Sequence, residues 1–184
     1  MAFLIVSIFP KLFVIDVFFF IMGKILGIIG GGQLGMMLTE AASNMKSEIS
    51  NVIVLDPTKN CPASKVGAEQ IVADFKDASA IKELAKKCDI ITYEIESGDS
   101  QVLKSLEETC EINPSPETLE IIQDKLVQKR FLAKNDIPVA EFREITSKYE
   151  LESKINEFGL PVLLKTRTGA VSYTHLTLPT ICSV

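Results

Sequence analysis

A glycine-rich turn between an apolar strand and a helix constrains this fold more than any other part of the sequence. Residues 24–38 read KILGIIGGGQLGMML. The apolar run Ile25–Ile29 predicts a buried strand, and the apolar residues that follow recur at helical spacing. A strand that passes directly into a helix is typical of a parallel sheet covered by helices. The predicted apolar stripe of the helix consists of Leu34, Met37, Leu38, Ala41 and Met45.

The turn itself has the composition of an anion-binding site. Gly30, Gly32 and Gly35 have G-x-G-x-x-G spacing, and glycine lets a ligand approach the backbone closely. The free N–H groups and positive dipole end of the following helix favour a phosphate or carboxylate. Asp56 follows the next strand, where dinucleotide enzymes place the acid that binds the ribose. The spacing also occurs in turns that bind no ligand, and Asp56 can instead brace its own turn.

Strands and helices alternate between Met22 and Asn113. This alternation predicts a parallel sheet covered by helices, with ligands beyond the carboxyl ends of the strands. Gly30–Gly35, Asp56 and Glu94 all follow predicted strands, so we expect them to meet at one edge of the sheet. The predicted strands are Lys24–Ile29, Asn51–Leu55, Gln70–Ala73, Ile90–Tyr93 and Glu111–Ile112, and the predicted helices are Gln33–Met45, Ala78–Lys87 and Ser100–Glu107.

The pattern changes at Pro114, where we predict a second domain to begin. Ser115-Pro116-Glu117 has the residue types of a helix start. The helical pattern that follows breaks near Gln123-Asp124 and ends before Ile137-Pro138. Beyond it the sequence predicts a strand, a helix with a Ser-x-x-Glu capping box and a second strand. These lie, in order, at Glu141–Ile145, from Ser147 to Phe158, and at Val162–Thr166.

Both ends of the chain depart from this organisation. Residues 1–21 are almost wholly apolar, but Lys11 and Asp16 would each cost about 2.5–3.5 kcal/mol near a bilayer centre. The segment also lacks the basic start and cleavage site of a signal peptide, so a non-native leader is favoured over a membrane span. Residues 171–184 contain no Asp, Glu, Lys or Arg and hold the only histidine, His175. This string resembles a translated sequencing adapter, so we predict an artefact and no catalytic role for His175.

Composition excludes several classes of function. The net charge is −5, from 19 basic and 24 acidic residues, and without a basic cluster a nucleic-acid partner is excluded. Four cysteines without a C-x-x-C pair favour neither zinc nor a disulfide framework, and they fit a reducing compartment. We therefore predict a cytoplasmic location and buried free thiols. The cysteines are Cys61, Cys88, Cys110 and Cys182.

Five ordered segments together resemble the N5-carboxyaminoimidazole ribonucleotide synthetase family of ATP-grasp ligases. They are GGGQLG (30–35), LDP (55–57), TYEIE (92–96), PSPETLEIIQDK (114–125) and PVLLKTRTG (161–169). The resemblance implies an α/β fold, with a Rossmann-like pre-ATP-grasp domain at residues 22–113. The truncated start of an ATP-grasp domain would follow at residues 114–170.

The family carboxylates 5-aminoimidazole ribonucleotide with bicarbonate and ATP in de novo purine (IMP) biosynthesis. The resemblance therefore implies a carbon–nitrogen ligase with ATP and Mg²⁺ as cofactors, these small molecules as partners, no membrane partner, and a homodimer at full length. One alternative is an NAD-binding Rossmann domain of a dehydrogenase or regulatory protein, suggested by the glycine spacing and Asp56. Another is a membrane-tethered binding module, suggested by residues 1–21.

The resemblance assigns the glycine turn to the ribonucleotide and not to a dinucleotide. Gly32, Gln33, Leu34 and Glu94 match the substrate-contacting positions of the family or of the similar glycinamide ribonucleotide transformylase. An amide with helix N–H groups can hold a phosphorylated ribose, and a carboxylate can accept hydrogen bonds from hydroxyls or an amine.

Two lysines match the ATP-contacting positions of the family. Lys125 corresponds to the position at which the family carries an ATP-binding Arg or Lys, and Lys165 to the lysine of a strand that contacts the ATP phosphates. Positive charge there stabilises phosphoryl transfer. The preceding apolar residues predict that Lys165 is buried and needs a partner. The glycine-rich phosphate loop only begins at Thr166–Gly169, so the main catalytic and magnesium-binding residues would lie in a missing part, and we expect the fragment to be inactive alone.

Overall fold

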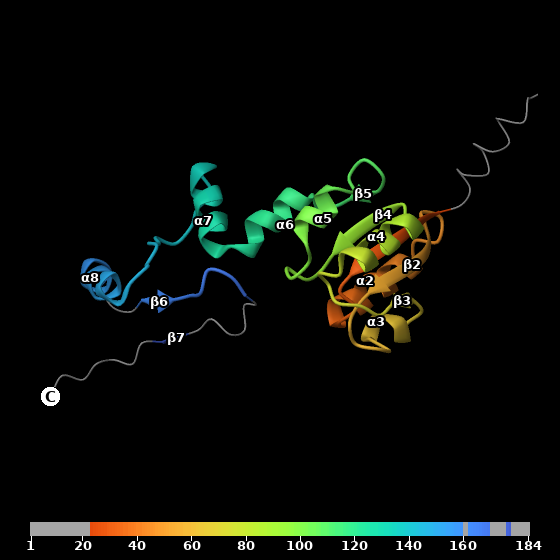
Figure 1. Cartoon of the computed structure of the whole chain (residues 1–184), viewed down its shortest axis with the longest axis horizontal. Coiled ribbons are helices and arrows are strands. Elements are labelled where there is room, and N and C mark those ends of the chain that lie inside the picture. Colours follow the sequence, from red (N-terminus) through yellow and green to blue (C-terminus); the bar gives the residue numbers. More distant parts are fainter. Residues whose placement is uncertain (1–22, 160–161, 170–175, 178–184) are drawn as a thin grey trace, which may run out of the picture. The chain divides into compact units, whose positions relative to one another are not determined.

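The computed structural model describes residues 23–159, 162–169 and 176–177. These residues form two compact units that divide between Pro116 and Glu117, and Figure 1 shows the elements of each. Residues 1–21, His175 and Cys182, on which several predictions fall, lie outside the described residues. Within the described part, no helix has the length and hydropathy needed to cross a membrane.

A five-stranded parallel sheet forms the first unit, as the sequence predicts. The strand order is β3-β2-β1-β4-β5, with β1 paired to β2 on one side and to β4 on the other. The order therefore reverses at β1, and in open α/β sheets ligands bind at the carboxyl ends of the strands that flank such a reversal. The strands are β1 Lys24–Ile29, β2 Ile49–Leu55, β3 Glu69–Ile71, β4 Ile90–Tyr93 and β5 Glu111–Ile112.

Helices cover both faces of this sheet. Successive strand residues point to opposite faces, and Gly27 lies against Leu84 of α4 whereas Ile28 packs with Ala42 of α2. Helices α4 and α5 begin at the predicted residues, where Asp77 and Asp99 cap their first backbone N–H groups. A short helix, α3, was not predicted. The helices are α2 Gln33–Ser43, α3 Pro62–Lys65, α4 Ala78–Lys87 and α5 Ser100–Lys104.

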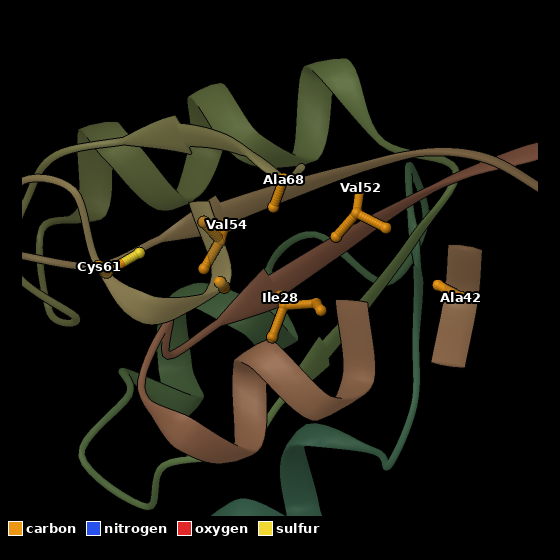
Figure 2. Packing of buried hydrophobic residues seen from close by; sticks show 7 residues of the cluster. Ile28, Ala42, Val52, Val54, Cys61 and Ala68 are labelled. Atoms are coloured by element: carbon orange, nitrogen blue, oxygen red, sulfur yellow. The ribbon is translucent and has the colours of Figure 1, made fainter. Parts of the chain in front are cut away.

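The core on the α2 side of the sheet is built from small and β-branched residues (Figure 2). Ile28 and Val54 are fully buried at its centre. The neighbouring strands β1 and β2 both pack against α2 through these side chains. This packing fixes the carboxyl ends of the two strands next to the glycine turn. The buried members of the cluster are Ile28, Ala42, Val52, Val54, Cys61, Ala63 and Ala68.

The apolar stripe predicted for α2 does not face the core. The buried residues of this helix are Gly35, Thr39 and Ala42, whereas Leu34 and Met37 are 56% and 54% exposed. The reason is close approach: a Cβ atom on Gly35 would lie 2.2 Å from the Gly30 carbonyl oxygen. Only small side chains fit between α2 and the sheet, so the larger apolar residues lie on the outer side.

The second unit contains three helices among its described residues and a two-stranded antiparallel sheet. The predicted helix break is confirmed, since Asp124 accepts hydrogen bonds from the backbone N–H groups of Leu126 and Val127 and starts a new helix. Strands β6 and β7 pair with each other. The elements are α6 Pro116–Gln123, α7 Lys125–Lys134, α8 Lys148–Phe158, β6 Leu163–Leu164 and β7 Leu176–Thr177.

Two details of the second unit differ from the sequence predictions. The strand predicted at Glu141–Ile145 is absent, because no described strand pairs with this segment and its charged side chains form ion pairs instead. The capping box of α8 is partly formed. Ser147 accepts a hydrogen bond from the Glu150 N–H, but the Glu150 carboxylate accepts from the N–H and hydroxyl of Thr146 and not from the Ser147 N–H.

Candidate functional site

The glycine turn joins the carboxyl end of β1 to the first residue of α2. Gly30 has a φ of +108°, and its N–H donates to the Leu55 carbonyl at 3.0 Å. A Cβ atom on Gly30 would lie 2.7 Å from the Glu94 side chain. Glycine at this position is thus required both by the backbone conformation and by the approach of Glu94.

The Asp56 carboxylate faces the backbone of the turn. It accepts hydrogen bonds from the Gly31 N–H at 2.8 Å and from the Thr58 N–H at 2.7 Å. The residue is only 6% exposed. Asp56 therefore braces the loops after β1 and β2, which is the structural role left open by the sequence. The Asp56 carboxylate is therefore not accessible for the ribose-binding role that a dinucleotide enzyme would require.

Glu94 takes the position at the start of α2 that an anion would otherwise occupy. Its backbone N–H donates to the Ile29 carbonyl at 3.0 Å, which fixes the residue beside β1. Its half-buried carboxylate lies against the glycine turn: a Glu94 oxygen would be 2.7 Å from a Cβ atom on Gly30 and 3.5 Å from a Cβ atom on Gly32. Burial raises the pKa of Glu94, the negative charges of Asp56 and Glu96 raise it further, and the nearby backbone N–H of Gly32 opposes these effects.

The predicted substrate residues of the first unit lie around this turn. Gly32 precedes α2 and no side chain caps the helix at that residue. Gln33 and Leu34 occupy the first two helical positions and are exposed. The structure brings Gly32 and Glu94 into contact and leaves the Gln33 amide accessible next to them. Helix N–H groups, an amide and a carboxylate at one edge can bind a ligand that carries both hydrogen-bond donors and acceptors.

The two predicted ATP residues belong to the second unit, where the structure brings Lys125 to the segment that follows Lys165. The Lys125 backbone N–H donates to the Arg167 carbonyl at 2.8 Å, and its ammonium donates to the Gly169 carbonyl at 2.7 Å. Lys165 itself is exposed. The expected burial of Lys165 is wrong, because β6 contains only two residues and its Leu163 is 50% exposed.

Sequence reasoning missed an ion-pair network beside Lys125. Arg167 donates to both Asp124 and Glu144, and Arg130 donates to the other oxygen of Glu144. The Arg167 guanidinium lowers the pKa of Asp124. The available signals in the sequence were Arg167 after the second predicted strand and Asp124 at the helix break. Nothing in their spacing indicated that these two residues pair.

The described residues offer neither a metal site nor a reactive thiol. No group of three or more His, Cys, Asp or Glu side chains in the described part could hold a metal ion. Cys61, Cys88 and Cys110 are free and buried, as predicted. Burial raises the pKa of Cys88 to about 12, so this thiol stays protonated at neutral pH.

Comparison with known proteins identifies the family. Residues 22–123 match the model of the ribonucleotide synthetase preATP-grasp domain. The chain is 37% identical over 147 residues to N5-carboxyaminoimidazole ribonucleotide synthase of Staphylococcus aureus strain COL. That match covers 80% of this chain but 38% of the relative, so the chain spans well under half the length of the relative.

Solved structures of such enzymes share the fold. The N5-carboxyaminoimidazole ribonucleotide synthetase of Thermotoga maritima is 53% identical with a TM-score of 0.70, over 79% of this chain and 39% of that one. The Aspergillus clavatus enzyme, solved with ADP and 5-aminoimidazole ribonucleotide, is 35% identical with a TM-score of 0.71, over 80% and 41%. The chain therefore belongs to the family of the ribonucleotide synthetase preATP-grasp domain.

Proposed function

We propose that this chain contributes the ribonucleotide-binding domain and the first ATP-binding residues of a carbon–nitrogen ligase. The complete enzyme carboxylates 5-aminoimidazole ribonucleotide with bicarbonate, at the expense of ATP, in purine biosynthesis. One observation carries the proposal: of the two acids beside the glycine turn, Asp56 is buried in backbone hydrogen bonds whereas Glu94 lies at the start of α2. An acid in the second position suits a ribonucleotide better than a dinucleotide.

The chemistry of the first unit supports this substrate class. The Glu94 carboxylate accepts hydrogen bonds from ribose hydroxyls or an amine, and the Gln33 amide can both donate and accept. The exposed Leu34 side chain supplies an apolar surface beside them. Gly32 has no side chain to keep a ligand from its backbone, and the nearest atom to a Cβ atom there would be a Glu94 oxygen at 3.5 Å. The relative from Aspergillus clavatus binds 5-aminoimidazole ribonucleotide, which agrees with this assignment.

Lys125 and Lys165 are the proposed ATP residues. The Lys125 ammonium donates to the Gly169 carbonyl oxygen, a weaker partner than a phosphate. A phosphate that approached Thr166–Gly169 would therefore recruit this ammonium with little movement. Magnesium would accompany ATP in the complete enzyme, but the described residues contain no cluster that fits it, and we assign none of them to the metal. We further propose a cytoplasmic homodimer.

Titration of the chain with 5-aminoimidazole ribonucleotide tests the substrate assignment. We expect saturable binding by calorimetry, and a loss of about tenfold or more in affinity for Glu94→Gln, because a hydrogen bond to a charged acceptor contributes about 1.5–3 kcal/mol. Glu108→Gln, an exposed acid distant in sequence from the turn, is the matched control and should bind normally. Saturable binding of NADH without binding of the ribonucleotide would refute the proposal in favour of a dinucleotide domain.

A further inference from the structure

Four charged side chains of alternating sign form a continuous network at the start of α7. Arg167 contacts Asp124 and Glu144, and Glu144 contacts Arg130, which lies on α7 itself. We call these four residues the Arg167 network. The network begins and ends on one helix, and it includes one residue of the 135–147 connection and one of the segment after β6.

The Arg167 guanidinium is fully engaged by carboxylates. Its Nε and Nη2 donate to the Asp124 Oδ2 atom at 3.0 and 2.5 Å, and its Nη1 donates to a Glu144 oxygen at 2.9 Å. All three guanidinium nitrogens therefore face acids. A lysine offers a single ammonium and lacks this planar arrangement of donors. Arg167 is thus built to hold two carboxylates and is not positioned as a free cation for phosphate.

Asp124 connects the network to the helix backbone. Its Oδ1 accepts from the Leu126 and Val127 N–H groups at 2.9 and 3.2 Å, while Oδ2 binds Arg167. The Asp124 side chain is 21% exposed and that of Arg167 is 52% exposed. An isolated exposed ion pair contributes about 0–1 kcal/mol, partly because both side chains lose conformational entropy when they pair. Asp124 is already fixed as a helix cap and Arg167 makes several hydrogen bonds, so their pairing loses less side-chain entropy.

Backbone contacts align the same segment on the same helix turn. The Lys125 N–H donates to the Arg167 carbonyl, and the Lys125 ammonium donates to the Gly169 carbonyl. These contacts join one of the lysines proposed for ATP to the residues that directly follow the other. A shift of the segment away from α7 would separate Lys125 from Lys165 and from the start of the phosphate loop.

We propose that Arg167 is a positioning residue, which holds Lys165–Gly169 on the first turn of α7 before nucleotide binds. The proposal rests on the proposed ATP role of Lys125 and Lys165. Arg167 acts through Asp124 and Glu144 and leaves the phosphates to the lysines. The nucleotide then meets a preformed site and need not order the segment itself.

Amide hydrogen exchange of the 184-residue chain without nucleotide tests the first half of this proposal. The Lys125 amide is the reporter, because it donates to the Arg167 carbonyl. We expect Arg167→Gln and Arg167→Lys to accelerate its exchange by about fivefold, the upper range for an exposed pair. Asp124→Asn should do the same while the Leu126 and Val127 amides stay protected, since Asn caps helices as well as Asp.

Arg143→Gln is the matched control, because Arg143 is also an exposed arginine paired with two glutamates but does not contact the Lys165–Gly169 segment. Its Lys125 exchange should equal that of the unmodified chain. Unchanged Lys125 exchange in Arg167→Gln, or full protection in Arg167→Lys, would overturn the proposal. The second result would mean that positive charge alone is sufficient.

Titration of the same variants with MgATP tests the second half. We expect Arg167→Gln and Arg167→Lys to weaken binding alike, by about the factor seen in exchange, and Arg143→Gln to bind normally. Accelerated exchange with unchanged ATP affinity would overturn the positioning role. Absence of ATP binding by the unmodified chain would instead contradict the proposed ATP site. The exchange data, which are collected without nucleotide, would still show whether Arg167 holds the Lys165–Gly169 segment on α7.

Discussion

Replacing Asp56 by alanine would remove the acceptor of two backbone N–H groups at the glycine turn. The Gly31 N–H, in a buried position, donates to Oδ2 and the part-buried Thr58 N–H donates to Oδ1. The alanine methyl group cannot replace either bond. The loops that follow β1 and β2 would then lose the side chain that links them.

The cost follows from the burial of each donor. A buried donor left without a partner costs about 1–3 kcal/mol, and a donor that water can reach costs about 0.5–1.5 kcal/mol. The negative charge of Asp56 repels Glu94 and raises the Glu94 pKa. Asp56→Ala removes this repulsion, so part of the loss of stability is offset. We therefore expect Asp56→Ala to lower the free energy of unfolding by about 2–4 kcal/mol.

Urea unfolding followed by circular dichroism measures this change, through the shift of the transition midpoint at constant slope. Asp74→Ala is the control, because Asp74 also accepts a backbone N–H but at an exposed turn. Asp56→Asn should be destabilised as well, since both carboxylate oxygens face N–H donors and the amide NH₂ must oppose one of them. A loss for Asp56→Ala no larger than for Asp74→Ala would refute the bracing role.

Three further predictions concern the turn and the lysines. The pKa of Glu94 is raised in the folded chain, so the free energy of unfolding should fall as the pH rises above 4.5, the usual pKa of a Glu side chain. Glu94→Gln should flatten this decline in a pH series of urea midpoints. Gly35→Ala should cost about 1–3 kcal/mol, because its Cβ atom would lie 2.2 Å from the Gly30 carbonyl oxygen; Ser43→Ala, on the exposed side of α2, should not. Lys125→Met should weaken MgATP binding about tenfold in calorimetry without loss of helical circular dichroism.

Strands β1, β2 and β4 were predictable from sequence because each contains a short apolar run bounded by polar or glycine residues. β1, β4 and β5 have the predicted bounds, β2 begins two residues before the predicted Asn51, and β3 lies at Glu69–Ile71 and not at Gln70–Ala73. The packing face of α2 was not predictable from hydrophobicity. It depends on the 2.2 Å approach of a Gly35 Cβ atom to the Gly30 carbonyl, and such a tertiary distance leaves no periodic signal in the sequence.

The candidate site shows the same division between pattern and tertiary structure. The positions of Gly32, Gln33 and Glu94 at strand ends followed from topology, because parallel strands bring their carboxyl ends to one edge. The different orientations of Asp56 and Glu94 did not follow, since both are acids directly after a strand. The Arg167 network joins residues up to 43 positions apart, and no local pattern encodes such a pairing.

Those different orientations bear on which ligand the glycine turn accepts. In a dinucleotide site the start of the helix is left to the pyrophosphate, whereas here a Glu94 carboxylate oxygen lies 3.5 Å from the position of a Cβ atom on Gly32, directly before α2. A pyrophosphate at that point would meet a like charge in a half-buried setting, which is unfavourable. A ligand that brings hydroxyl or amine donors to the turn meets an acceptor instead. We therefore infer that the turn recognises the donor groups of a ribonucleotide, while Gly30 and Gly35 allow the close packing of Glu94 and α2.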